Sequence, residues 1–143
     1  MQKGGEPAMK TTIMLCDYAE ALGGKLYIMG GGWTMCPPGP RNMAVALRIL
    51  VPWSDTNRRH RLGLFLQDES GNTISLGDPP RPVEQVGDFE VGRPPGVPQG
   101  TEIDFSAVFN FFGLPLEPDR GYRWQLEIDS EPADSVSFRT SPK

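Results

Sequence analysis

The most informative segment of the chain is KLYIMGGGW, which covers Lys25–Trp33. It begins as a β-type apolar run, passes through three consecutive glycines and ends at a tryptophan. The segment CPPGP (Cys36–Pro40) follows, and its prolines stop any regular element that begins before them. Short apolar runs between glycine and proline punctuation are typical of an all-β domain.

Alternation of apolar and polar residues, the period of a half-buried strand, recurs in four other places. In Tyr122–Ile128 every second residue is aromatic or aliphatic, and the residues between them are charged or amide side chains. The other three segments show the same period. The predicted strands are Leu62–Leu66, Ile103–Phe111, Tyr122–Ile128 and Val136–Phe138.

Two more strands are predicted from less regular patterns. Met43–Val51 would also suit a helix, but its β-branched end and the following Pro52 favour a strand buried on both sides. Glu84–Val91 is predicted to be a strand whose alternation slips at Gly87, as a β-bulge would produce.

The first half of the chain is completed by strands at Thr11–Asp17 and Leu26–Thr34. They are joined through Tyr18–Gly24, where we expect a single helical turn. If the chain reverses at Gly23-Gly24, Cys16 lies opposite about position 31 rather than opposite Cys36.

A second hairpin is predicted at Ser70-Gly71-Asn72, because these residues favour tight turns. This turn would join Leu62–Asp68 to a short partner strand at Thr73–Leu76.

These segments amount to about eight or nine short strands. They predict an all-β fold, a two-sheet antiparallel β-sandwich that is Ig-like in general architecture. Residues 1–9 are predicted to be a flexible tail. Residues 10–143 are long enough for one sandwich domain with a core of its own.

Charge and composition exclude several classes of partner. The formal net charge is −4, which argues against a nucleic-acid partner. No apolar run approaches the ~18 residues of a membrane span, and the N-terminal residues lack the order of a signal peptide. We therefore expect a cytoplasmic protein with no membrane partner.

The chain has two cysteines and one histidine. Cys16 and Cys36 are expected to be free thiols, as in most cytoplasmic proteins. Together with His60 they supply too few ligands for a structural zinc site, and no cofactor is expected.

Catalytic and ion-binding interpretations find little support. Gly30-Gly31-Gly32 lacks the following helix and Lys-Ser/Thr of a phosphate loop, so we interpret it as a bend or bulge where another backbone or an aromatic ring packs closely. His60 lies among arginines and is interpreted as a hydrogen-bonded loop or edge residue rather than a catalytic base. Asp55 and Asp68-Glu69 lack the spacing of a calcium loop. We expect no enzymatic activity.

The three tryptophans differ in their surroundings. Trp124 lies on the apolar face of its strand and is predicted to be core. Trp33 and Trp53 lie at loop edges, where a tryptophan either caps the end of a sandwich or stacks on a sugar ring or a partner protein. The candidate ligand- or partner-binding residues are Trp33, Trp53, Arg58, Arg59 and His60.

Three large apolar residues alternate out of phase with the core faces of their strands: Phe65, Val108 and Phe112. Exposed apolar side chains in one area indicate an interface, so these residues are the candidate interface of a homodimer. A covering segment, for which the proline-rich Gly92–Gly100 is long enough, is the competing explanation.

Five strings of residues together resemble a family of small bacterial proteins of uncharacterised function, found mainly in actinobacteria. The resemblance covers nearly all of Lys10–Phe138, implies a single domain and carries no activity. The matching strings are GKLYIMGGGW (Gly24–Trp33), VPW (Val51–Trp53), NRRH (Asn57–His60), FEVGRPPG (Phe89–Gly96) and GYRW (Gly121–Trp124).

The sequence therefore predicts a non-enzymatic interaction or assembly module, with a homo-oligomer, most simply a dimer, as its form. A small-ligand or carbohydrate-binding domain that uses the loop tryptophans is the alternative. A hydrolase with an unrecognised site comes third.

Overall fold

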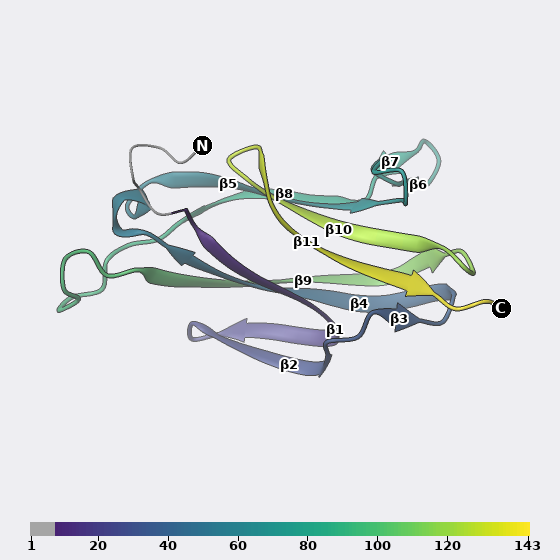
Figure 1. The fold of residues 1–143 in the computed structure, drawn as a ribbon, viewed down its shortest axis with the longest axis horizontal. Helices are drawn as coiled ribbons and strands as arrows, with labels where there is room; N and C mark the ends of the chain where they lie inside the picture. Colours follow the sequence, from purple (N-terminus) through teal and green to yellow (C-terminus); the bar gives the residue numbers. More distant parts are fainter. Residues whose placement is uncertain (1–7) are drawn as a thin grey trace.

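Two sheets face each other across an apolar core in the computed structural model, which describes residues 8–143 (Figure 1). The first sheet has the order β2-β1-β4-β9 and the second has the order β3-β11-β10-β5-β8. All pairs in the two sheets are antiparallel except β11 with β3. The predicted all-β, two-sheet sandwich is confirmed.

Residues 8–143 form eleven strands, eight of seven residues or longer and three of two residues, rather than the eight or nine predicted. In this part of the chain one 3-10 turn, η1, covers Trp53–Asp55. Among these strands, the short β6 and β7 pair only with each other. The strands are β1 (Lys10–Leu22), β2 (Lys25–Gly31), β3 (Met35–Cys36), β4 (Gly39–Val51), β5 (Arg59–Gln67), β6 (Ser75–Leu76), β7 (Arg81–Pro82), β8 (Glu84–Glu90), β9 (Ile103–Leu116), β10 (Gly121–Ile128) and β11 (Glu131–Thr140).

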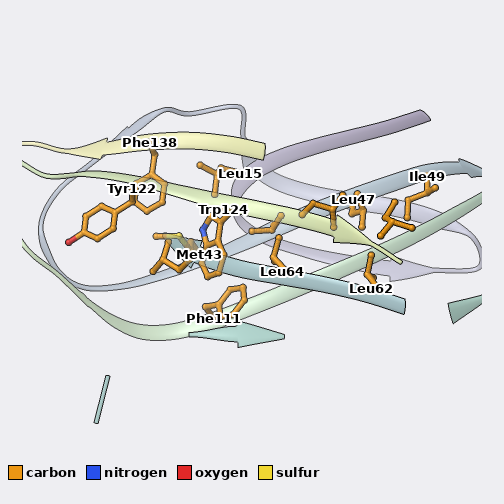
Figure 2. Packing of buried hydrophobic residues seen from close by; sticks show 14 of the residues in the cluster. Leu15, Met43, Leu47, Ile49, Leu62, Leu64, Phe111, Tyr122, Trp124 and Phe138 are labelled. Atoms are coloured by element: carbon orange, nitrogen blue, oxygen red, sulfur yellow. The ribbon is translucent and has the colours of Figure 1, made fainter. Parts of the chain in front are cut away.

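The core is built from the inward residues of both sheets (Figure 2). Trp124 of β10 is fully buried, as predicted, and its indole stacks on Phe111 of β9 with ring centroids 4.3 Å apart. Phe105 of β9 stacks in the same way on Phe89 of β8. These aromatic pairs join the two sheets, because each takes one ring from either side.

Strand β4 is buried on both faces, as predicted: Met43–Leu47 are all buried. Val45 and Leu47 belong to the main core. Ala44 and Ala46 belong to a second, smaller cluster with Cys16 and Ala19 of β1. Small side chains on this outer face allow another element to approach the sheet closely.

That element is the β1–β2 hairpin. Lys10–Cys16 of β1 pair with β4, whereas Cys16–Leu22 pair with β2. Figure 1 shows β1 turning back on itself, so that the hairpin lies against the outer side of β4 and β9. The amide of Asn110 on β9 donates to the carbonyl oxygen of Ala19 at 3.2 Å and ties the two together.

The register of this hairpin confirms the turn at Gly23-Gly24, since Cys16 pairs with Gly31. The helical turn predicted within Tyr18–Gly24 is wrong, because Tyr18–Leu22 continue as strand. Cross-strand partners in β2 outweigh the helix propensity of the Ala-Glu-Ala-Leu run here.

The triple glycine forms the predicted bend. Gly30 and Gly32 have φ of 62° and 88°, a region that favours glycine. A Cβ on Gly31 would lie 2.8 Å from both Ile28 Cγ2 and Met14 Sδ. The expectation that a backbone or an aromatic ring packs here is wrong, because the close groups at Gly31 are aliphatic and thioether side chains of β1 and β2.

Three local predictions have different outcomes. The turn at Ser70–Asn72 is confirmed, with Asp68 N–H donating to the Asn72 carbonyl at 2.9 Å and Gln67 bridged to Thr73. The partner strand predicted at Thr73–Leu76 is wrong, because β6 is shorter and pairs with β7 rather than with β5. The bulge at Gly87 is wrong, because β8 pairs with β5 without a register shift. Most of β8 is exposed at the sheet edge, so its alternation carries no burial signal.

The predicted tail, residues 1–9, lies mostly outside the described residues. Met9 packs partly against the core, so the domain extends at least to that residue. Among residues 8–143, no helix is long and apolar enough to cross a membrane.

Candidate functional site

His60, the only histidine, is held from both sides. Its Nδ1 lies 2.9 Å from an Asp129 carboxylate oxygen, and its Nε2 lies 2.7 Å from the carbonyl oxygen of Asp55. The residue is 4% exposed, and its ring lies against Phe89. The prediction that His60 is hydrogen-bonded is confirmed, but the residue lies within β5, an interior strand of the second sheet, rather than in a loop or at an edge.

Both partners of the imidazole are acceptors, so both ring nitrogens are satisfied only when the ring is protonated. Burial opposes the charged form. The hydrogen bonds to the Asp55 carbonyl and to Asp129 outweigh it and raise the pKa of His60. For Asp129, burial likewise opposes the charge, and hydrogen bonds from His60 and from the Arg61 N–H lower its pKa. Neither imidazole nitrogen is left to contact a substrate.

Trp53 lies near His60 and is covered by a residue that sequence reasoning missed. The Arg93 guanidinium stacks 3.8 Å from the centre of the indole. Arg93 Nε donates to Thr56 Oγ1 at 2.6 Å, and its Nη2 donates to the Trp53 carbonyl oxygen at 2.8 Å. One face of the indole is therefore occupied within the chain. No sequence pattern links positions 53 and 93, so only the fold reveals the pair.

The predicted arginines are exposed. Arg58 forms an ion pair with Asp55 at 3.4 Å, and exposed pairs of this kind contribute little stability. Arg59 opens strand β5 and is also exposed. Arg58, Arg59, His60 and Trp53 share one end of the sandwich.

Trp33 lies at the other end. It precedes β3, packs edge-on against Phe138 with ring centroids 5.8 Å apart, and has its Nε1 buried without a partner in the described part of the chain. The thirteen residues of β4 separate the chain near Trp33 from Trp53. The structure does not bring the two tryptophans into one site.

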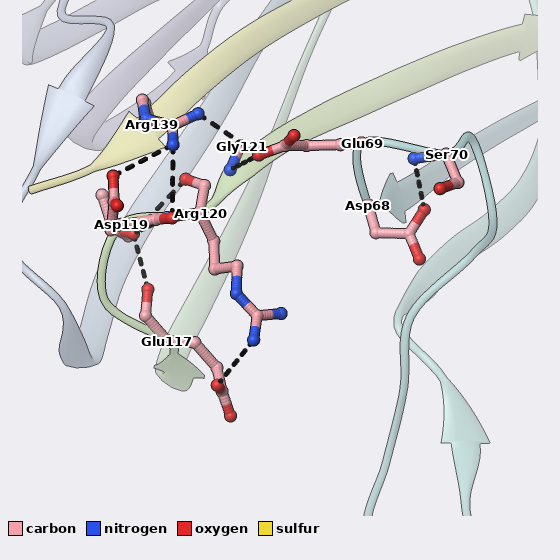
Figure 3. Close-up of polar contacts among 9 residues, drawn as sticks. Asp68, Glu69, Ser70, Glu117, Asp119, Arg120, Gly121 and Arg139 are labelled. Atoms are coloured by element: carbon pink, nitrogen blue, oxygen red, sulfur yellow. Dashed lines mark hydrogen bonds and ion pairs between the residues drawn. The ribbon is translucent and has the colours of Figure 1, made fainter.

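An open cleft of about 710 Å³ lies where the β5–β6 segment meets the β9–β10 connection (Figure 3). Arg139 bridges Glu69 at 3.2 Å and Asp119 at 3.0 Å, and the Gly121 N–H donates to Glu69 at 2.7 Å. Leu66, Ile74, Leu116 and Tyr122 supply apolar wall. Sequence reasoning singled out Asp68-Glu69 only as a weak calcium candidate, and within residues 8–143 no group of three metal-ligating side chains is found.

The two cysteines are both free. Cys16 is fully buried, with its Sγ 3.5 Å from the carbonyl oxygen of Ala44, and Cys36 is half-buried. Burial raises the pKa of both thiols. A raised pKa leaves little thiolate near neutral pH, which makes both poor nucleophiles.

The outward side of the β1–β2 hairpin differs from the rest of the surface. Tyr18, Leu22, Tyr27 and Met29 are 40%, 56%, 54% and 66% exposed. Cross-strand pairing sets Tyr18 beside Met29, Glu20 beside Tyr27, and Leu22 beside Lys25, so that these side chains share one side of the ribbon. We call this surface the hairpin face: Tyr18, Glu20, Leu22, Lys25, Tyr27 and Met29.

The three residues predicted as a dimer interface do not form one surface. Phe65 lies on the outer side of the second sheet, where its ring covers Gly63. Val108 packs under the β1–β2 hairpin with Ala44 and Ala46. Phe112 alone is widely exposed, at 70%. The hairpin, and not Gly92–Gly100, is the segment that covers Val108.

Comparison with known proteins gives one match. Among curated proteins and among solved structures nothing matches the chain. Residues 11–141, nearly the whole of the described domain, match a family of unknown function, DUF6941. The chain is a member of this family.

Proposed function

We propose that this protein is a non-enzymatic interaction module that binds a protein partner through the hairpin face. One observation carries the proposal: four large apolar side chains, Tyr18, Leu22, Tyr27 and Met29, lie on the same face of one ribbon and are 40–66% exposed. A contiguous exposed apolar patch on a soluble domain marks an interaction site. Aromatic and methionine side chains are also enriched in protein interfaces.

The hairpin is well suited to present such a surface. Its inner side packs on Ala44, Ala46 and Val108, and Asn110 fixes it through the Ala19 carbonyl. A surface that is ordered before binding loses less conformational entropy on association.

Two groups that a hydrolase could use, the His60 imidazole and the Cys16 thiol, are engaged or buried within the fold. Both nitrogens of His60 have partners, and Cys16 is fully buried. These contacts support a structural role for both residues.

Photo-crosslinking tests the proposal. A benzophenone amino acid is placed at Met29, on the hairpin face, or at Ser135, on the exposed polar side of β11, and the chain is expressed at native level in its own cells. The proposal predicts a discrete protein adduct from position 29 and none from position 135. No adduct from position 29, or equal labelling from both, would contradict it.

A small-ligand domain is the second candidate, and the cleft lined by Arg139, Glu69 and Tyr122 favours it. In that case a metabolite screen would raise the melting temperature of the wild type, and Leu76→Arg, at a partly buried position of the cleft lining, would abolish the shift. A shift that survives Leu76→Arg would place the ligand elsewhere.

A further inference from the structure

The hairpin face rests on a strand with a free edge. Strand β2 ends the first sheet, and in the described part of the chain it pairs only with β1. Figure 1 shows it at the rim of the molecule. An exposed strand edge offers a row of N–H and C=O groups to another strand.

The geometry of the turn determines which backbone N–H and C=O groups of β2 point away from β1. Gly23 and Gly24 have φ of 58° and 76°, as in a type I′ turn, whose flanking residues Leu22 and Lys25 form a hydrogen-bonded pair. By alternation, Tyr27 and Met29 also direct their backbone groups towards β1. Leu26 and Ile28 then direct theirs outward, at the edge.

A hydrogen bond at the opposite edge of the hairpin, on β1, agrees with this assignment of inward and outward backbone groups. If Tyr18, Glu20 and Leu22 bond to β2, the carbonyl of Ala19 must point away from β2. It does, because it accepts the hydrogen bond from Asn110 of β9.

We propose that the occupant of this edge is a second copy of the chain, paired antiparallel through β2 about a twofold axis at Tyr27. The inference rests on the proposed function and names its partner. In this register Leu26 of each copy lies opposite Ile28 of the other. Their outward N–H and C=O groups make four hydrogen bonds, and the two hairpins become one four-stranded ribbon.

A neighbouring register fits less well. An axis at Ile28 would set Leu26 opposite Gly30, whose φ of 62° takes its backbone groups out of the extended strand. That register keeps only the two hydrogen bonds between the Ile28 residues. The axis at Tyr27 is therefore preferred.

The hairpin face is self-complementary in this arrangement. The two Tyr27 rings meet on the axis in a non-hydrogen-bonded pair, where cross-strand side chains are closest. On either side Lys25 lies opposite Met29 of the other copy. The Tyr27 and Met29 side chains of the two copies thus become neighbours across the new strand pair, while Tyr18 and Leu22 lie one strand farther out on β1.

The charges also fit a second copy. With strands about 4.8 Å apart and residues about 3.4 Å apart along them, Lys25 lies about 12 Å from Glu20 of the other copy at the backbone. The two Lys25 residues lie about 14 Å apart, as do the two Glu20 residues. Opposite charges are thus closer than like charges, and long side chains shorten the favourable distance further.

Cysteine cross-linking tests both the partner and the register. On mild oxidation, Tyr27→Cys should form a disulfide-linked dimer. Lys25→Cys alone and Met29→Cys alone should not, because neither position faces itself, but an equal mixture of these two variants should. The expected rates for the pairing positions exceed those of the single controls about a hundredfold, since paired thiols meet at millimolar effective concentration.

Wild-type chain with its native Cys16 and Cys36 is the background control, and all variants lie on the exposed side of the hairpin. Cross-linking of Tyr27→Cys no faster than of Lys25→Cys would overturn the proposal. A photo-adduct at Met29 with a different protein, together with no Tyr27→Cys disulfide, would overturn self-pairing and leave the proposed function standing.

Discussion

Trp124 shows how single residues hold the sandwich together. It is fully buried between the two sheets, and its indole stacks on Phe111. We expect Trp124→Ala to lower the free energy of unfolding by ~3–5 kcal/mol, the usual loss for a buried tryptophan. Trp53→Ala should lower it by less than half as much, because Trp53 is half-buried and its main contact is Arg93. Urea unfolding measures both, and equal losses would mean that the burial pattern is wrong.

His60 and Asp129 make stability depend on pH. The folded-state pKa of His60 is raised, so its contribution is fully present below the unfolded value of about 6.5 and is lost as pH rises through the folded value. The folded-state pKa of Asp129 is lowered. Its contribution is present above about pH 3.9 and is lost as pH falls through the folded value.

The difference in stability between wild type and His60→Gln should therefore be larger at pH 6 than at pH 9. Urea midpoints of the two proteins at each pH measure it. Asp129→Asn is the matched variant and should flatten the same dependence. A difference between wild type and His60→Gln that stays constant, or widens towards pH 9, would show that the pair does not act as described.

The β1–β2 hairpin depends on one glycine for its close packing. A valine at Gly31 would press on Ile28 and Met14, both 2.8 Å from the added Cβ, and overpacking of this kind costs ~1–3 kcal/mol. Gly87→Val is the control, since a Cβ there meets nothing within 4 Å, and its effect should stay within ~0.5 kcal/mol. Both variants are compared by urea unfolding. A Gly87→Val loss as large as that of Gly31→Val would contradict the packing.

Strands with one buried face could be predicted from the sequence. Tyr122–Ile128 alternate in burial along β10, and that alternation is visible in the residue types. The turn at Gly23-Gly24 also fixed the pairing of Cys16 with Gly31, because a two-residue turn sets the register of a hairpin.

The path of the hairpin could not be predicted. Near Asp17 and Gly30 the ribbon bends, and after the bend Ala19 is buried while Tyr18 is exposed. Before the bend, Leu15 faces the main core and Cys16 faces the second cluster, so odd and even positions of β1 face opposite sides. After the bend the two sets have exchanged sides, because Ala19, an odd position, joins the cluster of Cys16. The local residues Ala19–Leu22 also suit a helix. The packing of the hairpin against β4 and β9 decides which side chains of this segment are buried.

At the scale of the molecule, the sandwich supports the hairpin, and within residues 8–143 the outer side of the hairpin is exposed. Val108 could be recognised from the sequence as an apolar residue on an outer face, but not the hairpin that covers it. The hairpin face was missed because Tyr18 was assigned to a helical turn, and because Tyr27 and Met29 belong to an ordinary strand pattern. Their exposure depends on packing that is distant in sequence.

Light scattering across a micromolar dilution series tests the central claim, that β2 pairs with β2 of a second copy. The wild type should have a mass near twice the 15.8 kDa of one chain. Tyr27→Asp, which sets two carboxylates against each other on the axis, should have the mass of one chain, and Ser135→Asp on the other sheet should remain a dimer. A wild type at 15.8 kDa, or a Tyr27→Asp variant that stays dimeric, would contradict the claim.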